Sequence, residues 1–261
     1  MYATERQDLI ESLLGDEERL AVVELARRFE VTTETVRRDL AALEARGVLR
    51  RVHGGAIPSD RSSTRETSVS ERVREHGDEK RAIAECALDL LDDGFDGSLF
   101  IDAGTTTAAI AERLPARLAR HGGHAEVVTH SFALAPSLAD ADSVSLSVIG
   151  GRVRGVTSAA VGAGTVSAIG RLRPDIAYVG TNGVSAGLGL STPDPDEAAV
   201  KQAIVRAARL VVVVCDASKF GRELLVGFAE LTDIDVLVTD AAPDGPLAAA
   251  LAEAGVEVRI A

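Results

Sequence analysis

Residues 102 to 107 combine a carboxylate, a glycine and three consecutive hydroxyls. They read Asp102-Ala103-Gly104-Thr105-Thr106-Thr107 and follow an apolar run that ends at Ile101. Backbone N–H groups at the start of a helix, together with such hydroxyls, bind anions such as phosphate. The run therefore predicts a phosphate cradle, although a helix cap made by Thr105 alone is the simpler interpretation.

Similar polar residues follow other apolar segments. The carboxylate of Asp216 can accept hydrogen bonds from ligand hydroxyls, and the ammonium of Lys219 can neutralise a phosphate. An Asp and a Lys three residues apart also form a common local ion pair, so this pair alone is a weak indication. Further candidates at such segment ends are His130, Ser131, Gly150, Gly151 and Asn182.

Lysine is rare in this chain, with three residues against 25 arginines. All three, Lys80, Lys201 and Lys219, fall near these segment ends. Glu197 and Lys201 have the i,i+4 spacing of a stabilising helical ion pair, which is more usual than a ligand clamp. The scarcity of lysine nevertheless keeps Lys201 among the ligand candidates.

Beyond residue 78, apolar strands alternate with amphipathic helices. This alternation predicts an α/β domain with a mostly parallel sheet, and such sheets bind ligands at the carboxyl ends of their strands. The helix that starts at Asp78 is expected to turn Ile83, Ala87, Leu90 and Leu91 inward. The expected strands are Leu99–Asp102, Val127–Thr129, Ser145–Ile149, Ile176–Val179, Leu210–Cys215, Val236–Thr239 and Val256–Ile260.

The first 56 residues predict a different unit, a helix-turn-helix. Apolar residues with helical spacing indicate a first helix, a tight turn follows at residues 30–32, and Thr32 or Thr33 can cap a second helix. Arg37 and Arg38 lie beside inward-facing residues and therefore point outward, on a helix that suits a DNA major groove. The inward residues are Val22, Leu25, Ala26 and Phe29, then Val36, Leu40 and Leu43.

The flanking sequence completes a winged helix. Thr4 and Gln7 have capping-box spacing before a helix that buries Ile10, Leu13 and Leu14. Gly47 is expected to end the second helix, Val48-Leu49 to form a strand, and residues 50–56 to form a basic hairpin with glycines at its tip. We expect Asp39 to orient a neighbouring arginine through an ion pair. The expected DNA contacts are Thr33, Thr35, Arg37, Arg38, Arg50, Arg51 and His53.

Composition indicates two units joined by a linker. Residues 57–64 are polar and rich in serine, and no apolar periodicity returns before Asp78. The predicted organisation is a winged helix over residues 1–57, a linker over 58–77 and an α/β domain over 78–261. Two distant cysteines, no signal peptide and no apolar stretch long enough to cross a membrane indicate a reduced, cytoplasmic protein.

The charge balance argues against DNA binding. The net charge is −12, and even residues 1–59 carry nine arginines against eleven carboxylates. DNA-binding domains are usually basic. Our hypothesis is that the carboxylate-rich surface is an adaptation to concentrated salt; an ordinary acidic protein from a GC-rich genome is the alternative.

The N-terminal pattern, the run at 102–107 and residues 216–219 together resemble the DeoR family of sugar-metabolism repressors over essentially the whole chain. The resemblance implies a winged helix joined to a sugar-phosphate-sensing domain with a fold similar to ribose-5-phosphate isomerase. It implies that Arg37 and Arg38 help to read the operator. Two positions depart from the family: His130 replaces an asparagine and Ser191 a threonine. The effector contacts that the resemblance implies are Arg72, Lys80, Asp102, Gly104, Thr105, Thr106, Thr107, Asp216 and Lys219.

These features predict a DNA-binding repressor of sugar catabolism, of the fructose, glucose or glycerol type. The expected partners are double-stranded promoter DNA, a phosphorylated sugar effector and further copies of the chain in a dimer or tetramer. No cofactor, metal or membrane partner is expected.

Two alternatives remain. The same cradle with an acidic base would suit a sugar-phosphate isomerase, but no tuned carboxylate pair emerges. The second alternative is a repressor that senses a dinucleotide. Residues 162–167 (Gly-Ala-Gly-Thr-Val-Ser) weakly resemble a dinucleotide-binding glycine pattern, although the last position is serine and no clear strand–helix–strand unit accompanies it.

Overall fold

The computed structural model describes residues 2–16, 20–46, 48–58, 63–64 and 69–261. The chain divides into two compact units, Met1–Arg65 and Glu66–Ala261, which we call the N-terminal and C-terminal units. The division falls within the predicted linker, residues 58–77.

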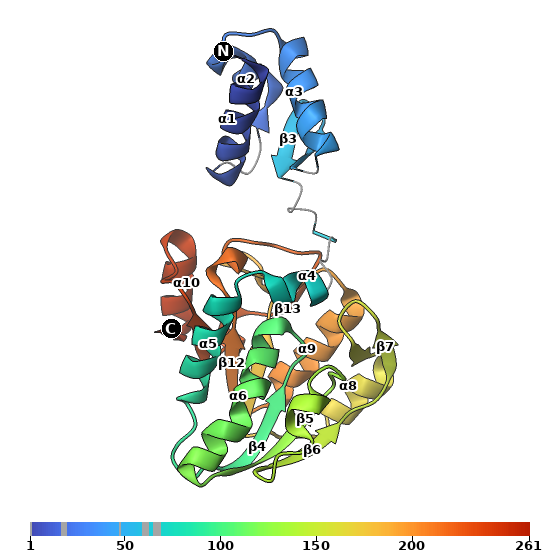
Figure 1. The fold of residues 1–261 in the computed structure, drawn as a ribbon, viewed down its shortest axis with the longest axis vertical. Helices are drawn as coiled ribbons and strands as arrows, with labels where there is room; N and C mark the ends of the chain where they lie inside the picture. Colours follow the sequence, from blue (N-terminus) through green and yellow to red (C-terminus); the bar gives the residue numbers. More distant parts are fainter. Residues whose placement is uncertain (1, 17–19, 47, 59–62, 65–68) are drawn as a thin grey trace. The chain divides into compact units, whose positions relative to one another are not determined.

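The N-terminal unit packs three helices against a three-stranded antiparallel sheet (Figure 1). The helices are α1 (Ala3–Asp16), α2 (Val22–Arg28) and α3 (Thr33–Ala45), and the sheet order is β1 (Leu20–Ala21), β3 (Gly55–Pro58), β2 (Leu49–Val52). The predicted winged helix is therefore confirmed. Its buried core consists of Ile10, Leu14, Leu20, Val22, Leu25, Ala26, Val36, Leu40, Leu43, Leu49 and Ala56.

Local contacts fix the turn between α2 and α3. Glu30 takes a positive φ of 53°, which reverses the chain after α2. Thr32 Oγ1 then accepts a hydrogen bond from Thr35 N at 3.2 Å. Thr32, rather than Thr33, is therefore the residue that caps α3.

The capping box predicted at the start of α1 is wrong. The helix begins at Ala3, so Thr4 lies inside its first turn, and Glu5 Oε2 instead accepts a hydrogen bond from Tyr2 N at 2.9 Å. Gln7 Nε2 reaches Asp39 Oδ1 at 3.3 Å. Thr4 and Gln7 have the spacing of a capping box, but Thr4 cannot be the N-cap because the helix begins one residue before it. The helix end predicted at Gly47 lies outside the described residues.

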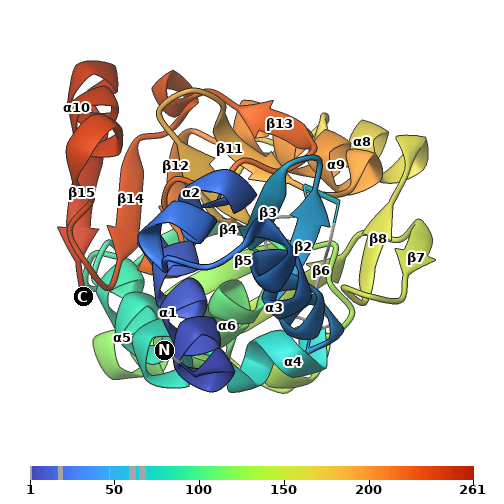
Figure 2. The same ribbon diagram turned by 90° about the horizontal axis from the view of Figure 1, so that it is seen from above.

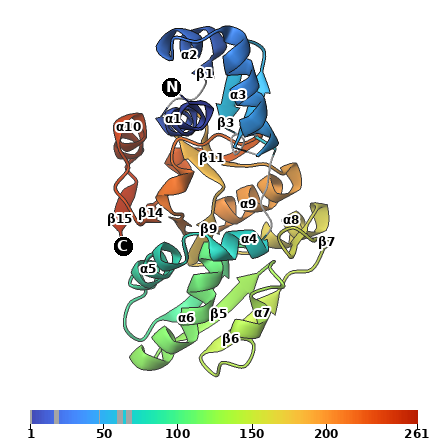
Figure 3. The same ribbon diagram turned by 45° about the horizontal axis from the view of Figure 1, so that its top comes forward.

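Strands β2 and β3 form the predicted hairpin, which lies beside α3 (Figure 3). Gly54 at its tip has a φ of 76°, which favours glycine. Gly55 is needed for a different reason, because a Cβ there would lie 2.2 Å from Leu20 O of the paired strand β1.

The C-terminal unit is built on a seven-stranded sheet in which every pairing is parallel. All seven strands correspond to the predicted apolar runs, so the predicted fold class is confirmed. In order across the sheet they are β15 (Glu257–Ile260), β14 (Val236–Thr239), β12 (Leu210–Val214), β9 (Ile176–Gly180), β4 (Asp96–Ile101), β5 (His124–Thr129) and β6 (Val144–Val148).

Helices cover both faces of this sheet (Figure 2). Successive strand residues point to opposite faces, so Leu99 and Ile101 enter one core while Phe100 enters the other. The first core is closed by α5 (Gly77–Leu88), α6 (Thr105–His121) and α7 (Ala135–Leu138). The second is closed by α8 (Ala163–Ile169), α9 (Pro195–Ala207) and α10 (Gly245–Ala254).

Several short elements are not predicted by the apolar patterns. Two small antiparallel sheets consist of β10 (Gly183–Ser185), β11 (Gly189–Thr192) and β13 (Val226–Ala229), and of β7 (Arg152–Arg154) with β8 (Ala159–Val161). Such strands are too short to show a period. Helix α4 (Val69–Arg74) lies within the predicted linker, and the 3-10 turns η2 (Ala217–Lys219) and η3 (Leu231–Asp233) follow β12 and β13.

Candidate functional site

Three neighbouring strands of the parallel sheet bring distant polar residues together at their carboxyl ends. Asp102 follows β4, Gly180 ends β9 and Asp216 follows β12, and β9 lies between the other two. The candidate residues form two groups at these ends, one around Asp102 and one around Asp216.

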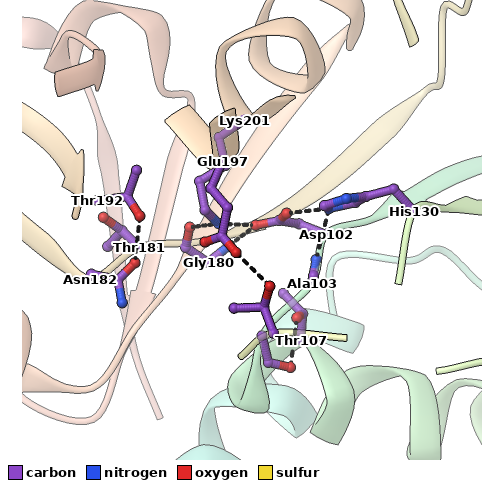
Figure 4. Close-up of polar contacts among 12 residues, drawn as sticks. Asp102, Ala103, Thr107, His130, Gly180, Thr181, Asn182, Thr192, Glu197 and Lys201 are labelled. Atoms are coloured by element: carbon purple, nitrogen blue, oxygen red, sulfur yellow. Dashed lines mark hydrogen bonds and ion pairs between the residues drawn. The ribbon is translucent and has the colours of Figure 1, made fainter. Parts of the chain in front are cut away.

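Asp102 is completely buried and lies between Lys201 of α9 and His130, which follows β5 (Figure 4). The Lys201 ammonium donates to Asp102 Oδ2 and, at 2.8 Å, to Gly180 O. Gly180 N also donates to Asp102 Oδ2 at 3.0 Å. The buried carboxylate is thus compensated by a cation and by backbone, which is what a charge inside a protein requires.

His130 is engaged by protein atoms on both sides of its ring. Nε2 lies 3.0 Å from Asp102 Oδ1, and Nδ1 lies 2.8 Å from Ala160 O. Ala103 N also approaches Nε2, at the longer distance of 3.3 Å. The histidine therefore orients Asp102 and links β5 to β8.

The charges around Asp102 determine its ionisation. Burial by itself would raise the pKa of the Asp102 carboxyl, but the Lys201 ammonium and the His130 ring outweigh burial and lower the pKa to about 2. Asp102 is therefore a carboxylate at every physiological pH, and it is not available as a proton donor.

The predicted ion pair between Glu197 and Lys201 is wrong. Glu197 Oε1 accepts hydrogen bonds from Arg154 Nη1 at 3.0 Å and from Thr157 Oγ1, while Lys201 pairs with Asp102. Both α9 side chains are buried and find partners on other elements. The i,i+4 spacing does not decide the pairing, because the buried partners offer charge-assisted hydrogen bonds.

The run 104–107 begins α6, with Gly104 as its N-cap. No side chain caps this end, so the Thr105 cap considered above is not what the structure contains. Thr107 Oγ1 instead donates back to Gly104 O at 3.1 Å, and Thr106 and Thr107 are buried. The first backbone N–H groups of a helix have no partner within it, so this end can accept an anion.

The second group surrounds Asp216, which is 1% exposed. Its Oδ1 accepts a hydrogen bond from Ser218 N at 3.2 Å and lies 3.8 Å from Lys219 Nζ. Burial raises the pKa of Asp216, but Lys219 and Ser218 outweigh it, so the pKa is lowered. Its Oδ2 is buried and accepts no hydrogen bond from any described residue.

Lys80, in the first turn of α5, faces the same group. Its side chain is almost fully buried, and Nζ donates to Arg72 O at 2.5 Å and to Glu75 O at 2.6 Å. Burial lowers the pKa of Lys80, while the Asp216 carboxylate acts in the opposite direction. The structure thus brings Lys80, Asp216 and Lys219 together, with the backbone of Arg72 close by.

Other predicted ligand residues have partners of their own. Gly150 O accepts a hydrogen bond from Thr165 Oγ1 at 3.0 Å. A Cβ on Gly151 would lie 2.1 Å from the same Thr165 Oγ1. These glycines therefore allow close packing against α8. Asn182 Oδ1 accepts a hydrogen bond from Thr192 Oγ1 at 3.0 Å, and Ser131 N donates to Thr129 Oγ1 at 3.1 Å.

The glycine pattern at 162–167 does not belong to a dinucleotide fold. It follows β8, which pairs with β7 in a two-stranded antiparallel sheet and is not a strand of the parallel sheet, and α8 spans only Ala163–Ile169. A dinucleotide site needs this pattern between a strand and a helix of the parallel sheet.

Sequence reasoning missed two residues of the Asp216 group. His76 precedes α5 with a φ of 54°, and its imidazole helps to lower the pKa of Asp216. Ser218 donates to Asp216 from both its backbone and its hydroxyl. His76 could have been found from its spacing, because it lies one helical turn before Lys80. Ser218 could have been found as a turn residue that follows Asp216.

On the N-terminal unit, α3 carries Arg37 and Arg38 on its exposed side. Arg37 Nη1 lies 3.7 Å from Glu34 Oε2 in a solvated pair, which leaves it free to move toward DNA. Arg50 of the wing is exposed as well. Arg51 instead forms an ion pair with Glu44, with Nε and Oε2 2.6 Å apart, so a phosphate contact by Arg51 would have to compete with that carboxylate.

Asp39 forms an ion pair with an arginine, as expected, but the partner is Arg6 of α1 and not Arg37 or Arg38 beside it in the sequence. Asp39 is buried, and its Oδ2 lies 2.5 Å from Nε of Arg6 on α1. Arg37 and Arg38 turn the other way because they lie on the outer face of α3. Asp39 therefore holds two helices together rather than orienting a DNA contact.

Among the described residues, no helix is long and apolar enough to cross a bilayer. No three or more His, Cys, Asp or Glu side chains in that part of the chain gather so that they could hold a metal ion.

A winged helix with outward arginines, joined to an α/β unit with charged groups at the carboxyl end of its sheet, defines a two-domain DNA-binding regulator. The DeoR-like helix-turn-helix profile matches residues 6–62, and the DeoR C-terminal sensor domain profile matches residues 75–241. The chain belongs to the DeoR family of transcriptional regulators.

Relatives match along nearly the whole chain. The transcriptional regulator GlpR of Haloferax volcanii is 37% identical over 258 residues, which cover 99% of this chain and 98% of that protein. FruR of Bacillus subtilis is 34% identical, with 92% of each chain covered, and the glycerol-3-phosphate regulon repressor of Escherichia coli is 31% identical, with 93% of each covered. These relatives are named as regulators, so the family consists of DNA-binding regulators rather than enzymes.

Solved structures that resemble part of the chain include ribose 5-phosphate isomerase A from Methanocaldococcus jannaschii. The TM-score is 0.42 at 18% identity, covering 57% of this chain and 56% of that one. The eIF2B delta subunit from Chaetomium thermophilum also has a TM-score of 0.42 at 18% identity, covering 65% and 58%.

Proposed function

We propose that this protein represses genes of sugar catabolism and responds to a phosphorylated sugar bound at the carboxyl end of the C-terminal sheet. The observation that carries the proposal is the buried Oδ2 of Asp216, which accepts no hydrogen bond from a described residue while two lysine ammonium groups lie near it. A buried acceptor without a donor is costly, and a sugar hydroxyl would satisfy it. Relatives named for glycerol 3-phosphate support this class of effector.

In this proposal the phosphate and the sugar hydroxyls of the effector contact different groups of the protein. The phosphate lies against the N-terminus of α6, where Lys80 and Lys219 neutralise it, and the sugar hydroxyls donate to Asp216. The charged and polar groups of Asp102, His130 and Lys201 already bond to one another, so in this proposal they hold the strand ends in place and do not contact the effector. The proposed contacts are Arg72, Lys80, Gly104, Thr105, Thr106, Thr107, Asn182, Asp216 and Lys219.

The N-terminal unit is proposed to bind the operator through α3 and the wing. Thr33, Thr35, Arg37 and Arg38 contact base edges and phosphates in the major groove, and Arg50, Arg51 and His53 approach the backbone. Two copies of the chain would place two such helices on a pseudo-palindromic site, so a homodimer or a homotetramer is proposed. The net charge of −12 supports a cytoplasm with concentrated salt as its environment.

Isothermal titration calorimetry tests the effector. Glucose 6-phosphate, fructose 1-phosphate, fructose 6-phosphate and glycerol 3-phosphate are compared with glucose, fructose and glycerol. At least one phosphorylated ligand is expected to bind, its unphosphorylated partner to bind far more weakly, and the same ligand to change operator affinity. Lys219→Met should weaken binding of that ligand, whereas Arg173→Met, a distant surface change, should not. Binding of none of them would reject the proposal.

A further inference from the structure

The Lys80 ammonium interacts with two parts of the C-terminal unit, the end of α4 and the group around Asp216. Its ammonium donates to the carbonyl oxygens of Arg72, at 2.5 Å, and of Glu75, at 2.6 Å. Arg72 lies in α4 and Glu75 just beyond its end. The last carbonyls of a helix have no partner within it, so a buried ammonium there acts as a C-terminal cap.

The same ammonium faces the proposed effector group. The charges that act on Lys80 are those of Asp216, Lys219, Glu75 and Arg72. A lysine ammonium has three N–H donors, and two of them are used by the carbonyls of Arg72 and Glu75. One donor remains, so an anion that takes more than one hydrogen bond from Lys80, or that pulls the ammonium toward itself, competes with the carbonyls at the end of α4.

Helix α4 is the first described element after the wing that belongs to the C-terminal unit. The backbone from the N-terminal unit therefore reaches the sheet of the C-terminal unit by way of α4. Besides the Lys80 contacts, α4 packs beside α6 and Val69 N donates to Val156 O at 3.4 Å (Figure 1). At six residues, α4 is too short to be stable without such contacts.

We propose that Lys80 couples effector binding to the linker: without ligand its ammonium holds α4 on the C-terminal unit, and a bound phosphate draws the ammonium away and loosens α4. The inference rests on the proposed function for the identity of the ligand, but the restraint on α4 exists without it. The two N-terminal units of a dimer can bind both halves of an operator only when they are held at a fixed separation. A less restrained α4 therefore lowers operator affinity.

Hydrogen exchange of the full-length, ligand-free protein tests the restraint directly. Lys80→Met removes the donors and keeps the length of the side chain. Peptides over residues 69–75 are expected to exchange roughly tenfold faster than in the unmodified protein. Arg81→Met is the matched control, because Arg81 lies next along α5 but is exposed and pairs with Asp78. Unchanged exchange over residues 69–75 in a folded Lys80→Met variant would overturn the proposal.

A second arm needs no substitution and separates this proposal from the effector assignment. Inorganic phosphate is titrated into the unmodified protein against chloride at equal ionic strength, with binding followed by calorimetry. Bound phosphate is expected to speed exchange over residues 69–75; bound phosphate that leaves or slows that exchange overturns the coupling. If phosphate does not bind but Lys80→Met frees α4, the restraint stands and the effector assignment fails. Lys80→Arg, which keeps donors and charge, replaces Lys80→Met if the latter does not fold and should leave α4 protected.

Discussion

Arg6 Nε lies 2.5 Å from Oδ2 of Asp39, and both side chains are buried. This ion pair ties α1 to α3 on the side of α3 that faces away from Arg37 and Arg38. The helix that carries the proposed DNA contacts is thus held from behind by a charge pair, in addition to its apolar core.

The first prediction concerns this pair. Arg6→Met leaves the Asp39 carboxylate buried without its cation, and breaking one side of a buried pair costs about 3–5 kcal/mol. The matched control is Arg46→Met, which removes a partly exposed pair, with Arg46 Nη2 at the end of α3 and Glu11 Oε1 of α1 2.9 Å apart. That loss should stay below about 1 kcal/mol. Urea unfolding of the full chain measures both, and equal effects would contradict the prediction.

Operator binding provides the second prediction. Arg37→Ala and Arg38→Ala should each weaken binding by about 1–3 kcal/mol, because each would remove a proposed contact with a base edge. Gel-shift titration against a promoter fragment is the measurement, and Arg173→Ala, exposed on the C-terminal unit, is the control. Unchanged affinity in both α3 variants would remove these arginines from the interface.

The wing glycines give a third prediction. Gly55→Ala should disrupt the pairing of β1 and β3, because its Cβ would lie 2.2 Å from Leu20 O. Gly54→Ala meets no atom within 4 Å and is strained only by its φ of 76°, so it should cost about 1–2 kcal/mol. Calorimetric melting distinguishes the two. A Gly55→Ala variant as stable as Gly54→Ala would show that the wing can shift to admit the methyl group.

Acid stability provides the fourth prediction. The pKa of Asp102 is about 2 in the folded chain, below the value near 4 of an unfolded aspartate. A lowered folded pKa means that the carboxylate contributes stability above about pH 4 and loses it as pH falls through about 2, by on the order of 2 kcal/mol.

Asp102→Asn tests this attribution. Asp216 also has a lowered pKa, so the comparison between variant and unmodified protein isolates the part that belongs to Asp102. The unfolding free energy of the variant should be lower at neutral pH and should fall less steeply below pH 4. Parallel pH profiles for the two proteins would exclude the Asp102 assignment.

Salt dependence gives the fifth prediction. Neutralising about six phosphates gives a log–log salt slope near −5, so a tenfold rise in salt would cost roughly five decades of affinity. A repressor adapted to concentrated salt must rely more on base contacts, shape and dimerisation, and its slope should be shallower. Titration of operator affinity against KCl measures it, and a steep slope with binding lost by about 1 M would count against the salt hypothesis.

The sequence by itself determined the strands of the parallel sheet and the helices of the N-terminal unit. Each strand of that sheet overlaps an apolar segment of the sequence, and the helices of the N-terminal unit carry apolar residues with helical spacing. Both signals are local, since they depend on which side of one element faces the core. The outward direction of Arg37 and Arg38 follows from the inward residues beside them, so the sequence also indicated the DNA-binding class.

Only the tertiary structure decided the partners of the charged residues. Lys201 pairs with Asp102, 99 positions away in the chain, rather than with Glu197 one turn along its own helix. Asp39 pairs with Arg6 for the same reason, and Lys80 meets the backbone of α4. The order of strands in the sheet sets which chain ends become neighbours, and buried charges must then find opposite charges or hydrogen-bond partners among those neighbours. Spacing along the chain does not contain that information.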